Sequence, residues 1–309
     1  MTTVQIHPQS LCEAQSVGSG SVIEAFARVA RGVVIGEGCS IASGAVIGAG
    51  AQLADRVVIG AGSWIAPAAV IEADVSLGPN VTLAGGRATP ASEQAAAIVV
   101  RAGATIEAGS TLVGGITVGR GSIVEAGSMV ARSVPPYAVV AGNPAEIRRN
   151  LDTEGSLLSV PISKAEPGDL MVGVRSAKLS RFAEFSDLRG SLTAGDIPSE
   201  HVPFEVRRWF VVYDVPTREL RGEHAHRRCH QFLICVAGTV AVALDDGEHR
   251  TEVVLDSPAL GVHVPPMVWS SQLWYESSSV LLVLTSDPYD PDDYIREYER
   301  FLVEAGAQG

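Results

Sequence analysis

Aliphatic residues recur every six positions through the first half of the chain. The series runs from Leu11 to Leu83 and resumes from Val100 to Val130, and a small or β-branched residue such as Cys39 commonly follows four positions later. Neither the 3.6-residue period of a helix nor the two-residue alternation of a strand produces this pattern. A six-residue period is typical of a parallel β-helix, in which each hexapeptide forms a short strand and a corner. The aliphatic side chains should point inward and stack from coil to coil.

The six-residue pattern is interrupted once. The segment "AGGRATPASEQAAAI", residues 84–98, contains no matching aliphatic positions and several turn formers. Such a segment cannot continue the coil, so it predicts a loop that projects from the β-helix.

The pattern changes again after the first 150 residues. Residues 151–169 lose the six-residue period and are rich in turn formers, which predicts a linker. From residue 170 to residue 309, runs such as "EVRRWFVVYDV" and "TEVVLDS" read as short strands of a β-sandwich or small barrel. Asp245-Asp246-Gly247 is a hairpin signal. A C-terminal helix is predicted from residues at helical spacing: Tyr294, Ile295, Tyr298, Phe301 and Leu302.

Composition narrows the range of partners. The 309 residues have a net charge of −12, and only Lys164 and Lys178 are lysines, so neither nucleic acid nor an anionic membrane is expected as the main partner. The N-terminus has no basic region followed by an apolar stretch, and no apolar run approaches the length of a membrane helix. A cytoplasmic protein is therefore expected.

Three histidines lie close together in "RGEHAHRRCHQFLICVAG", residues 221–238. His224 and His226 share one face of the expected strand, whereas His230 is offset in register and should face the other side. An HxH pair either binds a metal or moves protons near neutral pH. The spacing resembles a cupin motif, but Gln231 replaces the usual glutamate and Ser270 the usual histidine. These are poor ligands for a divalent cation, so we expect no metal.

The β-helix region resembles the hexapeptide acyltransferases. The segment "VPPYAVVAGNPAEIRR", residues 134–149, is similar to the end of that family's helix. The resemblance implies a left-handed β-helix over residues 1–150, a homotrimer, and acetyl-CoA bound near Asn143, Pro144 and Arg148. "GPNV" also resembles sugar-nucleotide N-acyltransferases, but Gly85-Gly86 stands where those enzymes have Asn-Asp. A degenerate β-helix that serves only as a trimerisation scaffold therefore remains an alternative.

The C-terminal half resembles the dTDP-4-keto-6-deoxyhexose 3,4-ketoisomerases. The similarity extends over "PFEVRRWFVVYD", "RGEHAHRRCHQFLICVAG" and "SDPYDPDDYIREYERF". It implies a dimeric cupin barrel, or jelly roll, in which His224 and His226 are catalytic without a metal. It also implies four substrate-binding residues: Arg208, Arg221, Gln231 and Trp269.

The two resemblances together imply an all-β bifunctional enzyme that acts on dTDP-linked deoxysugars. The cupin would convert a 4-keto sugar to its 3-keto isomer, and the β-helix would N-acylate the derived 3-amino sugar. Trimers paired through cupin dimers would form a hexamer. The alternative from another class is a non-catalytic assembly that binds a sugar nucleotide.

Overall fold

The chain folds into two units, residues 1–151 and residues 152–309. The computed structural model describes residues 3–85, 97–151, 167–216, 220–274 and 276–306. Most of the expected linker, namely residues 152–166, lies outside the described residues. Within the described part of the chain, no helix is both long enough and apolar enough to cross a membrane.

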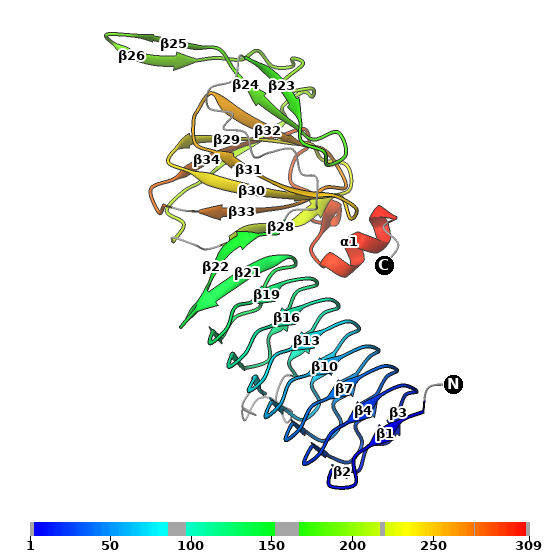
Figure 1. Cartoon of the computed structure of the whole chain (residues 1–309). Helices are drawn as coiled ribbons and strands as arrows, with labels where there is room; N and C mark the ends of the chain where they lie inside the picture. Colours follow the sequence, from blue (N-terminus) through cyan, green and yellow to red (C-terminus); the bar gives the residue numbers. More distant parts are fainter. Residues whose placement is uncertain (1–2, 86–96, 152–166, 217–219, 275, 307–309) are drawn as a thin grey trace, which may run out of the picture. The chain divides into compact units, whose positions relative to one another are not determined.

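The first unit is a parallel β-helix with three sides (Figure 1). Strands on one side pair at intervals of 18 residues, as Val22 with Ser40 and Ser40 with Val58. The first sheet contains β1 (Gln5–Ile6), β4 (Val22–Ile23), β7 (Ser40–Ile41), β10 (Val58–Ile59), β13 (Ser76–Leu77), β16 (Thr105–Ile106), β19 (Ile123–Val124), β21 (Ala138–Gly142) and β22 (Ala145–Asn150). The second contains β2 (Leu11–Cys12), β5 (Arg28–Val29), β8 (Val46–Ile47), β11 (Trp64–Ile65), β14 (Thr82–Ala84), β17 (Thr111–Val113) and β20 (Met129–Val130). The third contains β3 (Ser16–Val17), β6 (Val34–Ile35), β9 (Gln52–Leu53), β12 (Val70–Ile71), β15 (Val99–Val100) and β18 (Thr117–Val118).

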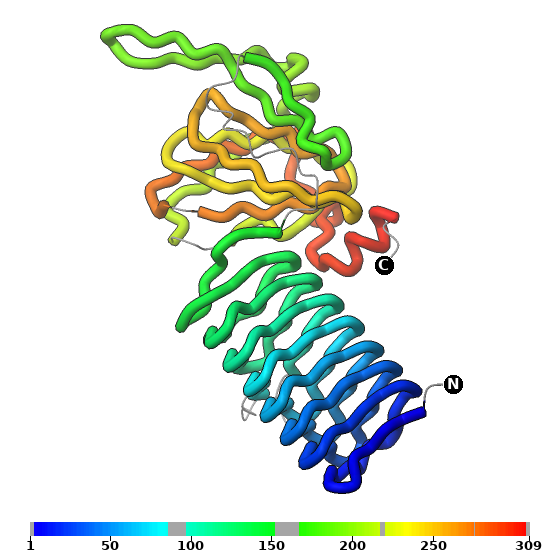
Figure 2. Tube along the Cα trace, in the orientation of Figure 1, coloured from blue at the N-terminus to red at the C-terminus, as the bar shows by residue number. Residues whose placement is uncertain are grey.

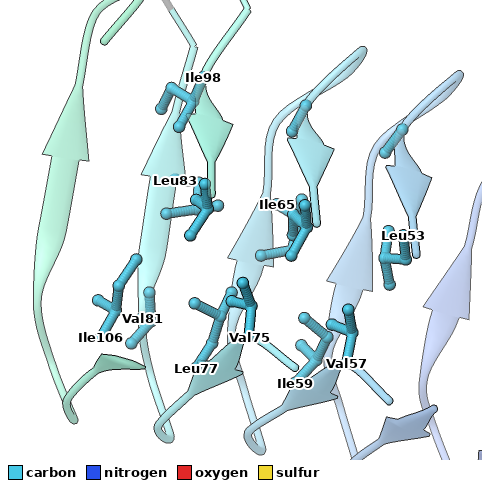
Figure 3. Close-up of a cluster of buried hydrophobic side chains, with 14 of the residues drawn as sticks. Leu53, Val57, Ile59, Ile65, Val75, Leu77, Val81, Leu83, Ile98 and Ile106 are labelled. Carbon is cyan, nitrogen blue, oxygen red and sulfur yellow. The ribbon is translucent and has the colours of Figure 1, made fainter. Parts of the chain in front are cut away.

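The six-residue aliphatic series forms the core of this unit. From Ile23 onward its members are at most 2 % exposed, and Figure 3 shows Leu53 of β9, Ile59 of β10 and Ile65 of β11 among the buried side chains. Leu11 is the exception, because it pairs with Arg28 and points outward while Cys12 takes the inward position beside Val29. The predicted β-helix is therefore confirmed, with its first turn one residue out of the expected register.

The break in the period does not disturb the pairing on either side of it. Val70 pairs with Val99, so 29 residues separate these neighbours instead of the usual 18. Most of the predicted projecting loop, residues 86–96, lies outside the described residues.

The second unit is a barrel of two antiparallel sheets. The six-stranded sheet contains β23 (Gly168–Met171), β24 (Lys178–Arg181), β32 (Leu260–Val264), β29 (Gln231–Ala237), β34 (Val280–Thr285) and β27 (Arg208–Val212). The five-stranded sheet contains β31 (Arg250–Leu255), β30 (Val240–Asp245), β33 (Trp269–Trp274), β28 (Leu220–His226) and β35 (Tyr294–Ile295). Side chains of both sheets, including Leu233 and Val242, form one core between them. A separate hairpin, β25 (Glu184–Asp187) and β26 (Gly190–Thr193), projects from this barrel (Figure 2).

The C-terminal segment differs from the sequence prediction. The 3₁₀ turn η2 (Pro291–Asp293) leads into β35, and helix α1 (Tyr298–Ala305) begins only afterwards. Tyr294 and Ile295 pair with His226 and Ala225 of β28, and this pairing replaces the first turn of the expected helix. The prediction of a terminal helix is confirmed, but its start at Tyr294 was wrong.

Candidate active site

A bulge in β28 determines which side chains reach the barrel interior. Arg221 pairs with Gln272 of β33 and His224 with Ser270, so one extra residue is accommodated in β28. Gly222 and Glu223 adopt positive φ angles of 83° and 51° at this point. Because of the extra residue, Arg221 and His224 face the same side although they are three residues apart.

That side is the interior of the barrel. Ser270 pairs with Leu244 and Gln272 with Val242, and both of these β30 residues belong to the core. Directly paired residues in a sheet face the same side. Arg221 and His224 therefore lie on the inner face of the five-stranded sheet, where Arg221 remains exposed to solvent.

The two imidazoles of β28 meet through their Nε2 atoms. His224 Nε2 lies 3.2 Å from His226 Nε2. On their other edges, His224 Nδ1 donates to the carbonyl oxygen of Gly222 at 2.8 Å, and His226 Nδ1 donates to Asp293 Oδ2 at 2.8 Å. A carbonyl or carboxylate oxygen can only accept here, so these partners assign a hydrogen to each Nδ1.

Asp293 is a residue of this site that was not predicted from the sequence. It comes from η2, is 4 % exposed, and accepts hydrogen bonds from the backbone N–H groups of Arg228 and Cys229 as well as from His226. Burial raises its carboxyl pKa, but the hydrogen bonds, with that from His226 foremost, outweigh burial and lower the pKa. A fixed carboxylate of this kind orients the imidazole it contacts.

Burial shifts both imidazoles toward their neutral forms. Burial is the main cause that lowers the pKa of His224 to about 4, and the neighbouring charges of His226 and Arg296 contribute. Burial also lowers the pKa of His226, while Asp293 acts in the opposite direction. The pair can therefore accept protons near neutral pH.

Aromatic and cationic side chains surround the pair. The ring of Tyr294 lies 4.8 Å from the His224 ring and 4.3 Å from the His226 ring. The guanidinium of Arg296 stands 4.4 Å from the Tyr294 ring, and Arg208 is hydrogen-bonded to the Tyr294 side chain. Arg296 was not predicted from the sequence.

Three of the four predicted substrate-binding residues belong to this arrangement. Arg208 pairs with Thr285, which in turn pairs with Gln231, so all three face one side of the six-stranded sheet. The amide Nε2 of Gln231 lies 3.2 Å from His226 Nε2. Arg221 joins them through the bulge described above.

The structure places Trp269 apart from the other three predicted substrate-binding residues. Trp269 lies on β33 next to Ser270, so it faces the opposite side of the sheet. It is 6 % exposed, and its ring lies 5.2 Å from Tyr298 and 5.7 Å from Phe301 of helix α1. Trp269 therefore anchors α1 to the barrel and does not line the site.

His230 lies on the other side of the six-stranded sheet. Its Nδ1 is 3.0 Å from His263 Nε2, and the two rings stack within 5° of parallel. Phe204 packs beside both rings. His230 therefore faces away from His224 and His226, as its strand register predicts.

One group of potential metal ligands occurs among the described residues. Ligand atoms of His226, Cys229 and Asp293 all lie within 4.8 Å of one another. The His226 and Asp293 atoms are already hydrogen-bonded to each other, and burial raises the pKa of the Cys229 thiol. These donors therefore fit a hydrogen-bonded network better than a cation site, and metal independence stays a prediction.

The predicted acyl-CoA residues lie together at the end of the β-helix. Asn143 and Pro144 form the turn between β21 and β22, which pair antiparallel. Asn143, Pro144 and Arg148 are all exposed. A Cβ added at Gly142 would lie 3.4 Å from Arg148 Nη2, which places that guanidinium beside the turn.

An inward-facing HxH pair in a two-sheet barrel defines a cupin, and comparison with known proteins defines its family. Residues 175–306 match the family described as WxcM-like, C-terminal (FdtA), and residues 16–49 match the bacterial transferase hexapeptide family. A TDP-4-oxo-6-deoxy-α-D-glucose 3,4-oxoisomerase from Aneurinibacillus thermoaerophilus is 42 % identical over 124 residues, which are 40 % of this chain and 88 % of that protein. The chain belongs to the WxcM-like family and carries an N-terminal hexapeptide-repeat domain.

Solved structures of both kinds are also similar. A 3,4-ketoisomerase from Helicobacter canadensis is 33 % identical with a TM-score of 0.40, over 42 % of this chain and 97 % of that one. A GDP-perosamine N-acetyltransferase from Caulobacter crescentus, solved with CoA and GDP-perosamine, is 26 % identical with a TM-score of 0.38. That similarity covers 48 % of this chain and 58 % of the transferase.

Proposed function

We propose that the barrel unit is a 3,4-ketoisomerase that converts a TDP-4-keto-6-deoxyhexose to the corresponding 3-keto sugar. The main support is the His224–His226 pair, whose two Nε2 atoms meet at 3.2 Å inside the barrel. The 42 % identity to the 3,4-oxoisomerase supports the substrate class. Moving a ketone between neighbouring carbons requires removal of a proton from C3 and delivery of one to C4, which imidazoles catalyse near neutral pH.

Asp293 acts as a positioning residue in this proposal. Its carboxylate binds His226 Nδ1 and thereby directs Nε2 toward the barrel interior. Arg208 and Arg296 flank Tyr294 beside the imidazoles, where they would bind the diphosphate of the sugar nucleotide. Arg221, exposed on the same face as His224, supplies a third cation.

The test is conversion of TDP-4-keto-6-deoxyglucose, followed by NMR in deuterated water. His224→Asn and His226→Asn should each lower turnover by about 10²–10⁴-fold, because each removes a proton-transfer group while keeping a similar volume. His230→Asn is the matched control, since His230 lies on the other side of the sheet, and it should keep turnover within a small factor. Wild-type rates in both HxH variants would refute the proposal.

For the β-helix we propose binding of acetyl-CoA and transfer of its acetyl group to the 3-amino sugar derived from the isomerase product. The match to the transferase hexapeptide family and the exposed Arg148 beside the β21–β22 turn support this assignment. The guanidinium would pair with a phosphate of CoA. Calorimetric titration with acetyl-CoA tests it: binding that weakens at least about tenfold in Arg148→Ala is expected. Absence of binding would leave the β-helix as a scaffold, and the size of the assembly in light scattering would test the trimer separately.

A further inference from the structure

The hydrogen bonds of the HxH pair account for the hydrogens on both Nδ1 atoms, but not for the close contact between the two Nε2 atoms. Both Nδ1 atoms donate to oxygen acceptors, so each ring already holds one hydrogen there. A neutral imidazole has a single N–H, so two neutral rings would present two bare Nε2 atoms to each other. Yet these atoms lie 3.2 Å apart, a distance typical of a hydrogen bond. His226 Nε2 also accepts a hydrogen bond from the amide Nε2 of Gln231 at 3.2 Å. The site is therefore shaped to hold one additional proton, which His224 Nε2 carries and donates to His226 Nε2.

We propose that His224 and His226 share one proton between their Nε2 atoms during catalysis, and that a diphosphate bound at Arg208 and Arg296 brings this proton in. The inference rests on the proposed isomerase function. It further specifies that the imidazole pair carries one positive charge during catalysis, and that substrate binding favours this charged form. The coupling follows from position, because both guanidinium groups contact Tyr294, whose ring packs on both imidazoles.

A pair with one shared proton supplies an acid and a base in the same step. In the first step one Nε2 takes the proton from C3 while the shared proton passes to the C4 oxygen, which produces a neutral enediol. In the second step the pair takes the proton of the C3 hydroxyl and delivers its own proton to C4, which produces the C3 ketone. The pair again holds one proton at the end, so every proton is accounted for. A pair without this proton has two bases and no acid, and a pair with two has no base.

The charges around the pair explain why the proton should arrive with substrate. Burial and the positive charges of Arg208 and Arg296 disfavour protonation of the rings, while Asp293 favours it. A bound diphosphate would neutralise the arginines and shift this balance toward the protonated pair. Other titratable or charged groups also lie on the segments around the pair: Arg221 and Glu223 on β28, Arg227, Arg228 and Cys229 between β28 and β29, and Tyr289, Asp290 and Asp292 beside Tyr294.

Calorimetry measures this proton directly. The full chain is titrated with thymidine diphosphate slightly above neutral pH, in several buffers that differ in ionisation enthalpy. The dependence of the observed heat on the buffer gives the number of protons taken up. We expect uptake of about one proton per site in the wild type. The double variant His224→Asn/His226→Asn should still bind the nucleotide but lose this uptake, and His230→Asn should keep both.

Equal proton uptake in the wild type and the double variant would overturn the inference, because the proton would then belong to the nucleotide or to another group. Failure of the wild type to bind thymidine diphosphate would also overturn it. Nitrogen-15 NMR adds a readout that needs no activity: both rings should show Nδ1–H, and an Nε2–H tautomer in both neutral rings would contradict the assignment. If the chain isomerises substrate without proton uptake, only this inference fails. If uptake is seen without isomerisation, only the proposed function fails.

Discussion

His263 should make folding of the barrel unit sensitive to mild acid. Its side chain is 4 % exposed and stacks on His230 beneath Phe204. Burial is the largest of the causes that lower its pKa from 6.5 to about 4, followed by the charges of His230 and Lys178. The folded protein therefore keeps this ring neutral at pH values where the unfolded chain protonates it.

The sign and size of the effect follow from this shift. Stability is complete above the unfolded pKa of 6.5 and falls as the pH drops toward the folded pKa of about 4. At about 1.4 kcal/mol per pKa unit, the full loss is about 3 kcal/mol, of which about 2 kcal/mol is reached by about pH 5. Asp169 affects stability only at lower pH. Burial raises its carboxyl pKa, but hydrogen bonds from Lys178 and His201 outweigh burial and lower the pKa from 3.8 to about 2. The stability that Asp169 contributes is therefore lost only as the pH falls below 3.8.

Urea unfolding monitored by tryptophan fluorescence tests the prediction. Trp209, Trp269 and Trp274 lie in the barrel unit, so three of the four tryptophans report on it. His263→Gln cannot titrate, so moving from about pH 7.5 to about pH 5 should cost this variant about 2 kcal/mol less than the wild type. His249→Gln, at an exposed position, is the matched control and should follow the wild type. Parallel pH profiles for the wild type and His263→Gln would refute the reasoning.

Three further outcomes are expected. Gly222→Ala should lower isomerase turnover by about 10²-fold or more. The added Cβ would lie 2.8 Å from Gln272 Nε2, at a backbone φ of +83°. The control is Gly190→Ala, which should leave turnover unchanged in the same assay because Gly190, at a φ of +127°, has open space around it. Trp269→Phe should lower the free energy of unfolding by about 1 kcal/mol, since it loosens the contact with α1, and calorimetry should show unchanged affinity for thymidine diphosphate. Prolonged treatment with a chelator should leave isomerase activity intact, and loss of activity that added metal restores would show that the HxH pair needs a cation.

Periodic features of this chain could be predicted from its sequence, because periodicity reports local geometry. The six-residue series, together with the small or β-branched residues four positions after its members, accounts for most of the inward side chains of the β-helix, since each coil repeats the environment of the previous one. The HxH spacing placed His224 and His226 on one face for the same reason. Leu11 misled the prediction because the first turn shifts register by one residue, and both Leu11 and Cys12 suit an inward position.

Features that depend on tertiary pairing could not be predicted in the same way. Asp293 lies 67 residues from His226 in the sequence, and four other acidic or aromatic residues surround it in "YDPDDY". The helical spacing around Tyr294 was real, but strand pairing with β28 overrides local helix propensity there. Trp269 was assigned by resemblance alone; counting strand alternation from Ser270 would have placed it on the outer face.

The pairing of Val70 with Val99 also shows where this β-helix can change its length. Compared with the 18-residue spacing of neighbouring strands, 11 additional residues are accommodated at a corner while the aliphatic positions on both sides stay in register. Added residues at a corner therefore alter what the surface presents without altering the interior. A single residue deleted within a strand such as β15 would instead move that strand's inward residue to the outward position. A fold of this kind can thus carry new surface segments at its corners while its interior packing stays unchanged.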